Sequence, residues 1–204
     1  MSNRKNHRSL PVQYLTRISI LTALAAVLFL TLEIPVVAFY KLDFSAVPVL
    51  LGAFSMGPGP ALIILALKEV IHLLLKGLGT TLGIGDLADF IMTAAFILPA
   101  GLLYRRHKTR KQAILGMALG TLCTIVVAVL TNWLLLFPTY MAAYHMDLQG
   151  IIGMASKALP FVDTEWKLLL FVTAPFNLLK GCVISLITAL IYKPLSPLLK
   201  VQAR

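Results

Sequence analysis

Two polar residues interrupt the last long apolar segment of the chain. Asn177 and Lys180 lie in the run Pro175-Phe-Asn-Leu-Leu-Lys-Gly181, whose other side chains are apolar or absent. Three residues apart in a helix, the amide and the ammonium group share one face. A lysine near the centre of a bilayer costs at least ~2.5 kcal/mol, so such a side chain normally faces a protein-lined cavity. The pair therefore predicts a buried polar binding site in a membrane protein.

The composition supports a membrane location. Of 204 residues, 59% are hydrophobic and 13% are charged, and the mean hydropathy is +0.89. Soluble domains are nearer one quarter charged, so the sequence predicts an all-α integral membrane protein. We expect a single membrane domain over residues 1–204, because several spans of about 20 residues leave no room for a separate soluble domain.

Six apolar segments are predicted to be transmembrane helices. Their approximate bounds are 15–40, 45–58, 60–76, 85–104, 113–137 and 168–192. The second and third segments are short, and the run Gly57-Pro58-Gly59-Pro60 between them favours a turn. If these two segments formed one interrupted span, the count would be five instead of six.

The basic residues distinguish the two counts, because cytoplasmic loops of membrane proteins gather Lys and Arg. With six spans, all three basic clusters fall on one side of the membrane; with five they do not. The clusters are Arg4, Lys5, Arg8 and Arg17 before the first span, Arg105, Arg106, Lys108, Arg110 and Lys111 after the fourth, and Lys193, Lys200 and Arg204 after the last. We therefore predict six spans, with the basic N-terminus (1–13) and the C-terminus both cytoplasmic. The net charge of +10 is attributed to topology, with lipid contact as the minor alternative and no nucleic-acid partner.

Asn132 is expected to lie near Asn177 and Lys180. A rise of 1.5 Å per residue places Asn177 ~14 Å and Lys180 ~18 Å below the outer end of the sixth helix, and Asn132 ~8 Å below the outer end of the fifth. Helical side chains lean toward the N-terminus of their helix, so Lys180 reaches outward and Asn132 inward. The three side chains are predicted to converge in the outer half of the bundle. Alternatively, Asn132 makes a helix–helix hydrogen bond.

Five other charged or titratable residues have structural explanations that compete with a role in binding. Asp86 and Asp89 either cap the fourth helix at its positive end or belong to the site. Lys68, Glu69 and His72 are close in the third helix, and an internal ion pair is their expected role.

Several function classes lack their motifs. No Walker A sequence, HExxH, GxSxG or paired metal-ligand pattern occurs, so we predict a protein that is not an enzyme and that holds no metal or cofactor. No inverted repeat is visible, which weakens a secondary carrier. Two alternatives stay open. One is a metal-dependent membrane enzyme that modifies lipids through Asp86 and Asp89, and the other is a facilitator that works without partner subunits.

A series of motifs between about residues 41 and 197 resembles one transporter family, in matching order. These motifs are Lys41-Leu-Asp-Phe-Ser45, Gly83-Ile-Gly-Asp-Leu-Ala-Asp-Phe90, Leu98-Pro-Ala-Gly-Leu-Leu-Tyr104, Thr131-Asn132 with Pro138-x-Tyr140, Pro175-Phe-Asn-Leu-Leu-Lys-Gly181 and Tyr192-Lys-Pro-Leu-Ser-Pro197. Together they resemble the substrate-binding S components of energy-coupling factor (ECF) vitamin transporters, specifically the riboflavin-specific type. The first and fifth motifs are the most specific.

The resemblance implies a six-helix S-component fold in the bacterial cell membrane that captures riboflavin from outside. FMN or another vitamin is the alternative ligand, because a phosphate could pair with Lys180. The positions that match the family's ligand contacts are Leu42, Asp43, Phe44, Ser45, Gly85, Asn132, Asn177 and Lys180.

The resemblance also implies partner proteins. In the family, a membrane coupling subunit and two ATPases supply the energy for transport. Small residues of the first helix contact the coupling subunit. The corresponding pairs in this chain are Ser19/Ala23 and Thr22/Ala26.

Overall fold

The computed structural model describes residues 12–37, 40–78 and 82–199, with side chains described as far as Tyr192. Most of the basic N-terminus, together with Lys200 and Arg204, lies outside the described residues. Residues 38–39 and 79–81 also lie outside the described residues.

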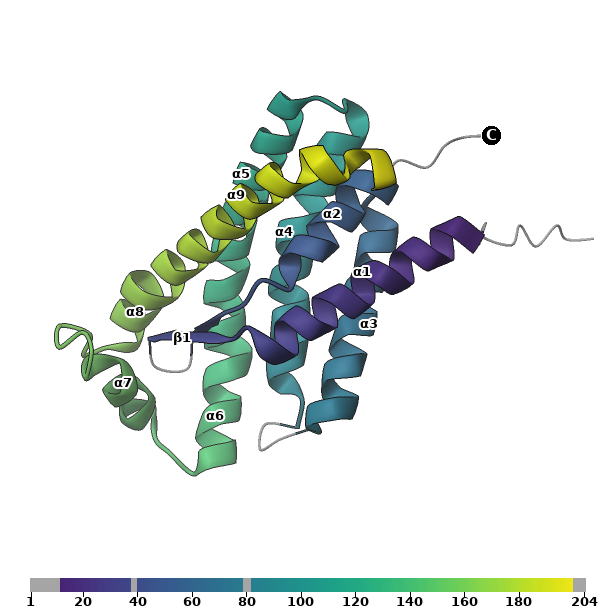
Figure 1. Cartoon of the computed structure of the whole chain (residues 1–204). Helices are drawn as coiled ribbons and strands as arrows, with labels where there is room; N and C mark the ends of the chain where they lie inside the picture. The colour runs from purple at the N-terminus through teal and green to yellow at the C-terminus, as the bar shows by residue number, and fades with distance from the viewer. Residues whose placement is uncertain (1–11, 38–39, 79–81, 200–204) are drawn as a thin grey trace, which may run out of the picture.

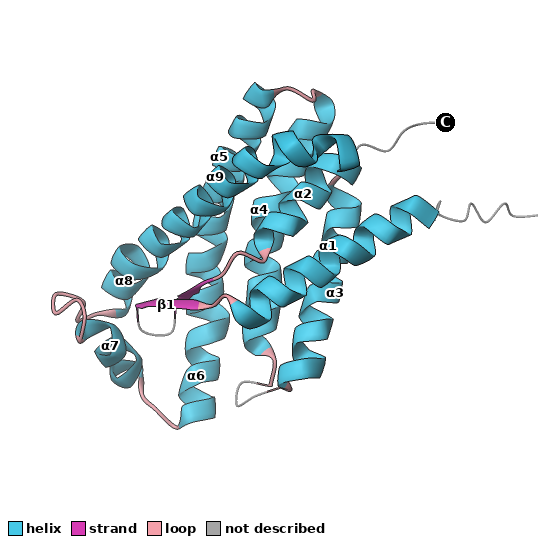
Figure 2. Cartoon of the chain, in the orientation of Figure 1, coloured by secondary structure: helices cyan, strands magenta, loops and turns pink. Residues whose placement is uncertain are grey.

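The described chain is a helical bundle with one small β-hairpin (Figure 1, Figure 2). Its elements in chain order are α1 (Val12–Thr31), β1 (Ile34–Val37), β2 (Tyr40–Leu42), α2 (Ala46–Met56), α3 (Pro58–Lys76), α4 (Ile84–Arg106), α5 (Arg110–Thr131), the π-helical segment η1 (Asn132–Leu136), α6 (Phe137–Tyr144), α7 (Leu148–Ser156), α8 (Glu165–Leu168), the π-helical segment η2 (Leu169–Thr173) and α9 (Ala174–Leu199).

Within the described residues, five continuous helical stretches are long and apolar enough to cross a membrane. They are Val12–Thr31, Pro58–Lys76, Ile84–Arg106, Arg110–Tyr144 and Glu165–Tyr192. Helix α2 is also apolar but has only 11 residues. The prediction of an all-α integral membrane fold is confirmed, whereas the count of six spans stays a prediction. Figure 1 shows the start of α1, the α4–α5 connection and the end of α9 in the upper half of the view. Their cytoplasmic location also stays a prediction.

The prediction of a first helix reaching residue 40 is wrong. Helix α1 ends at Thr31, and the chain then forms the antiparallel hairpin β1–β2, in which Ile34 pairs with Leu42 and Pro35 with Lys41. Pro35 has no backbone N–H for a helix, and the β-branched residues Val36 and Val37 favour an extended strand. The hairpin brings the chain back to the bundle, where Tyr40 of β2 is buried and Lys41 stays exposed.

The turn predicted between the second and third helices is confirmed. Gly57 separates α2 from α3 with a φ of 98°, a backbone conformation that side chains other than glycine rarely adopt. Pro58 then occupies the first turn of α3, where its missing N–H removes no helical hydrogen bond.

The two longest helical stretches each contain a π-helical segment next to a proline. Segment η1 lies between α5 and α6, just before Pro138, and η2 lies between α8 and α9, just before Pro175. A proline inside a helix cannot donate the usual hydrogen bond, and a wider π turn accommodates the loss. Asn132 begins η1 and Asn177 follows η2, so both amides lie at these irregular turns. The sequence predicted neither these turns nor helix α7.

Buried side chains form two apolar clusters. One joins α1, α2, α3, α4, α5 and α9 and includes Leu50, Ile64 and Ile184. The other joins β2, α6, α7, α8 and η2 and includes Tyr40 and Phe137. Tyr40 and Ile184 also line the cavity described below, so the cavity borders both clusters.

Only some of the small residues of α1 that were predicted to contact a coupling subunit lie on the surface. Ser19 and Ala23 are exposed, whereas Thr22 and Ala26 are buried within the chain. The helix packs on α3 and α2, and the rotation that buries one small-residue pair leaves the other on the surface. In this structure the four residues therefore do not form one contact face for a partner.

Candidate substrate-binding site

A cavity of about 270 Å³ lies between the hairpin and the helices. Residues from α1, β2, α2, α3, α4, α5, η1, α6 and α9 line it, together with Glu33 and Asp43 from the connections on either side of the hairpin. Five of the eight predicted ligand contacts line the cavity: Asp43, Gly85, Asn132, Asn177 and Lys180. The structure thus brings together residues that lie far apart in the sequence.

The other three predicted contacts have different surroundings. Leu42 ends β2 and is half-buried, and Phe44 packs against the larger apolar cluster. Ser45 is buried, and its backbone N–H donates to the Asp43 carboxylate at 3.0 Å. Their contact with a ligand stays a prediction.

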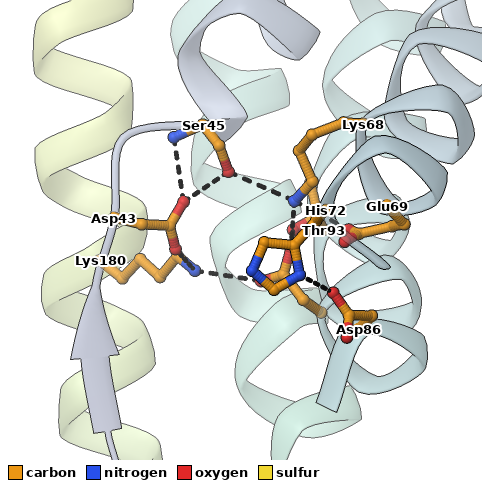
Figure 3. A network of polar contacts seen from close by, with 9 residues as sticks. Asp43, Ser45, Lys68, Glu69, His72, Asp86, Thr93 and Lys180 are labelled. Atoms are coloured by element: carbon orange, nitrogen blue, oxygen red, sulfur yellow. Dashed lines mark hydrogen bonds and ion pairs between the residues drawn. The ribbon is translucent and has the colours of Figure 1, made fainter. Parts of the chain in front are cut away.

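Lys180 is held between two carboxylates. Its Nζ lies 2.7 Å from Oδ2 of Asp43 and 3.3 Å from Oδ1 of Asp89. Figure 3 shows the Lys180 side chain beside Asp43. Asp43 belongs to the loop after β2, whereas Asp89 belongs to α4 and Lys180 to α9. These ion pairs join three separate parts of the fold at one point on the cavity wall. A lysine with no acid nearby in its own helix thus finds its partners through tertiary structure.

Lys68 extends this network behind the cavity. Its side chain is fully buried, and its Nζ lies 2.6 Å from Oδ2 of Asp89 and 2.8 Å from Oε1 of Glu69. The same ammonium donates to Oγ of Ser45 at 3.3 Å and lies 3.9 Å from the centre of the Phe29 ring. The ion pair predicted within α3 is confirmed. Asp89 bridges the two lysines, so each buried charge has an opposite charge beside it.

The open question about Asp86 and Asp89 is answered by these contacts. Asp89 bonds to Lys68 and Lys180, and Asp86 pairs with Nδ1 of His72. The N-cap residue of α4 is Gly83, which has no side chain to cap the helix. Both carboxylates therefore contact side chains of the polar interior, and Asp86 also lies in the first turn of α4, at the positive end of the helix. Since two ammonium groups occupy Asp89, its oxygens are poorly placed for the alternative metal-dependent enzyme.

A second polar group on the cavity wall is uncharged. The Tyr40 hydroxyl donates to Oδ1 of Asn132 at 2.9 Å and is also hydrogen-bonded to Oγ1 of Thr173. Nδ2 of Asn132 donates to the Ala128 carbonyl at 2.8 Å, and Nδ2 of Asn177 donates to the Thr173 carbonyl at 2.9 Å. Asn132 therefore lines the cavity and accepts a hydrogen bond from the strand β2, not from another helix, and its contact with a ligand stays a prediction.

Tyr40 is a cavity residue that the sequence analysis missed. Burial raises the pKa of its hydroxyl above the usual range, although the hydrogen bond with Thr173 opposes the shift. The hydroxyl therefore stays neutral and donates to the Asn132 amide. The feature of the sequence that could have indicated a role for Tyr40 in the cavity is its position immediately before the Lys41-Leu-Asp-Phe-Ser45 motif. Aromatic rings of Phe96, Tyr140 and Phe176 also line the cavity.

The fold and the site together define a multi-pass membrane protein with a buried binding cavity for a partly polar small molecule. Residues 13–192 match the family described as the ECF transporter, substrate-specific component. The chain belongs to this family, as its sequence motifs indicated. Membership makes it a multi-pass protein of the bacterial plasma membrane and a component of a transporter.

Curated relatives match nearly the whole chain. The riboflavin transporter RibU of Streptococcus thermophilus is 31% identical over 188 residues, which cover 90% of this chain and 84% of the relative. The riboflavin transporter RibU of Staphylococcus aureus is 30% identical and covers 98% of this chain and 99% of its own length. The riboflavin transporter FmnP of Bacillus subtilis is 29% identical, and the match covers 94% of this chain and 96% of the relative.

A solved structure supports the fold. The S component of a bacterial ECF transporter superposes with a TM-score of 0.69 at 28% identity, covering 93% of this chain and 98% of that one. The observed fold is therefore that of an S component.

Proposed function

We propose that this chain is the riboflavin-binding subunit of an ECF transporter and captures riboflavin from outside the cell. The observation that carries the proposal is the convergence of Asp43, Asn132, Asn177 and Lys180 on one cavity, because these residues come from the motifs of the riboflavin-specific type. The names of the relatives point to the same ligand.

The cavity wall suits the chemistry of a flavin. Riboflavin has a flat aromatic ring with polar groups on one edge and a chain of hydroxyl groups. The rings of Tyr40, Tyr140 and Phe176 offer apolar contact, and small-molecule pockets commonly combine such surfaces with a few placed polar groups. One N–H of Asn177 Nδ2 is used within its own helical stretch, which leaves the second N–H as a donor and Oδ1 as an acceptor for ligand groups.

The ion pairs of Lys180 favour an uncharged ligand over FMN. A ligand phosphate at Lys180 would have to compete with Asp43 and Asp89, which already neutralise the ammonium group at 2.7 and 3.3 Å. The phosphate would also carry about two negative charges close to these carboxylates, and like charges repel strongly in a buried site. We therefore expect riboflavin to bind more tightly than FMN.

Transport requires partners under this proposal. A membrane coupling subunit and two ATPases would drive uptake, and the exposed residues Ser19 and Ala23 are the part of the predicted α1 face that is open to the coupling subunit. Proteoliposomes that contain only this chain should bind riboflavin at the membrane without accumulating it. If riboflavin crossed such liposomes freely, the facilitator alternative would hold instead.

Purification tests the ligand directly. Protein prepared from cells grown with riboflavin should carry a yellow chromophore that is released on denaturation and matches riboflavin by mass. A colourless preparation that also leaves the fluorescence of added riboflavin unquenched would refute the proposal.

A further inference from the structure

His72 lies on the cavity wall, on the α3 side. The imidazole packs on the Phe29 ring, with the two ring centres 4.4 Å apart, and Nδ1 faces a carboxylate oxygen of Asp86. Its side chain is only 12% exposed, and His72 and Asp86 both line the cavity. From the sequence, His72 was predicted only to take part in an ion pair within its helix.

The second ring nitrogen of His72 has no hydrogen-bond partner among the described residues. Nε2 is buried, and Figure 3 shows it on the edge of the ring that points away from Asp86. A buried polar atom left without a partner destabilises the fold, so such atoms in native proteins call for an explanation.

The location of Nε2 supplies the explanation. Within the described part of the chain, five residues have buried side-chain polar atoms without a hydrogen bond: Thr22, Glu69, His72, Ser185 and Thr188. Only His72 among these five lines the cavity. The other four do not line the cavity, whereas His72 belongs to its wall, so a cavity ligand is the nearest source of a partner for Nε2.

We infer that His72 is a ligand-contacting residue whose Nε2 forms a hydrogen bond with an oxygen-bearing group of the bound flavin. This inference rests on the proposed function, and the predicted set of ligand contacts does not contain His72. The Asp86 carboxylate accepts from Nδ1–H and so fixes the orientation of the ring. Nε2 then accepts from a hydroxyl when the ring is neutral and donates to a hydroxyl or carbonyl oxygen when it is charged. Asp86 is the positioning residue of the pair.

Riboflavin titration of two variants tests the contact. His72→Phe retains an aromatic ring against Phe29 but removes both nitrogens, and we expect its riboflavin affinity to fall about tenfold or more. His72→Gln places an amide near the position of Nε2 and should recover part of the loss. Thr188→Val is the matched control, because it removes a buried unpaired hydroxyl outside the cavity and should leave the affinity unchanged.

A double-mutant cycle separates a ligand contact from a general effect on folding. Asp86→Asn should weaken riboflavin binding in the presence of His72 and have little further effect in His72→Phe, because its role is to orient the ring. Lumiflavin, which keeps the ring system but lacks the hydroxyl chain, identifies the ligand group. If His72→Phe weakens lumiflavin as much as riboflavin, the contact is to the ring; if only riboflavin is weakened, it is to the chain.

The failure of this inference differs from the failure of the proposed function. A wild-type protein that binds no riboflavin would refute the function. If the wild-type protein binds riboflavin and the His72→Phe variant binds it with equal affinity, the proposed function stands and the contact between His72 and the ligand is refuted.

Discussion

Two polar clusters attach the β2 region to the helices around the same cavity, and they do so by different chemistry. The charged cluster contains Asp43, Ser45, Lys68, Glu69, Asp89 and Lys180, and the amide cluster contains Tyr40, Asn132, Thr173 and Asn177. In the first, the Asp43–Lys180 ion pair links the loop after β2 to α9. In the second, the Tyr40–Asn132 hydrogen bond links β2 to η1.

The two clusters should therefore differ in how much each contributes to the stability of the fold. Removing one partner of a buried ion pair leaves an unpaired charge and costs about 3–5 kcal/mol. Removing one partner of a neutral hydrogen bond costs about 0.5–1.5 kcal/mol, or somewhat more if the other partner stays buried and unpaired. The charged cluster should therefore govern stability together with binding, and the amide cluster should affect binding with little change in stability.

The largest effect is expected from Lys180→Met. This substitution leaves Asp43 without its ion-pair partner, so the free energy of unfolding should fall by about 3–5 kcal/mol and riboflavin binding should be lost. Thermal unfolding in detergent, with and without riboflavin, measures both. Lys167→Met is the matched control, because Lys167 pairs with Asp163 on the surface and such pairs contribute about 0–1 kcal/mol. Equal melting temperatures for the two variants would contradict the comparison.

Lys68→Met should separate stability from binding within the charged cluster. Lys68 contacts Glu69 and Asp89 but does not line the cavity. We expect a loss of about 3 kcal/mol in stability, with a smaller loss of riboflavin affinity than in Lys180→Met. Calorimetry and fluorescence titration of the same preparation give the two quantities. A Lys68 variant that kept its stability and lost its binding would reverse the roles that we assign to the two lysines.

Asn177→Ala probes the amide cluster. The Asn177 side chain donates only to a carbonyl of its own helical stretch, so its loss should change the melting temperature little. Riboflavin affinity should fall by at least about 1 kcal/mol, or roughly fivefold, because a buried hydrogen bond to the ligand is lost. Ser185→Ala in the same helix, outside the cavity, serves as the control. Unchanged affinity in the Asn177 variant would remove this residue from the site.

The smallest change in structure is expected from Gly85→Ala. A Cβ atom at Gly85 would meet no atom within 4 Å, and the residue lies in the first turn of α4. Stability should therefore be equal to the wild type or slightly higher, since alanine is the better helix former. The added methyl group points into open space beside the cavity, so a moderate loss of riboflavin affinity would indicate contact with the ligand. Identical affinity would show that the ligand does not reach Gly85.

The sequence predicted best those features that depend on local composition. Hydropathy located the long helices to within a few residues at most ends, and Gly57 with Pro58 marked the turn between α2 and α3. The cost of burying a lysine indicated that Lys180 faces a cavity. Each of these features can be inferred from one segment without knowing what packs against it.

The features that the sequence did not predict depend on partners far along the chain. Asp89 and Lys180 are 91 residues apart, and only the packing of α4 and α9 brings them together. The rotation of α1 that buries Thr22 and Ala26 is set by its neighbouring helices. The β1–β2 hairpin was not predicted for a different, local reason: its apolar residues continue the hydropathy of α1, and hydropathy alone does not distinguish a strand from a helix.

Parallel fluorescence titrations of the purified chain with riboflavin and with FMN test whether the cavity binds a flavin and whether it prefers the uncharged one. We expect saturable quenching of riboflavin fluorescence at one ligand per chain, and a weaker affinity for FMN because Asp43 and Asp89 neutralise Lys180. Tighter binding of FMN would contradict the role of these ion pairs. Quenching by neither flavin would contradict the assignment of the cavity itself.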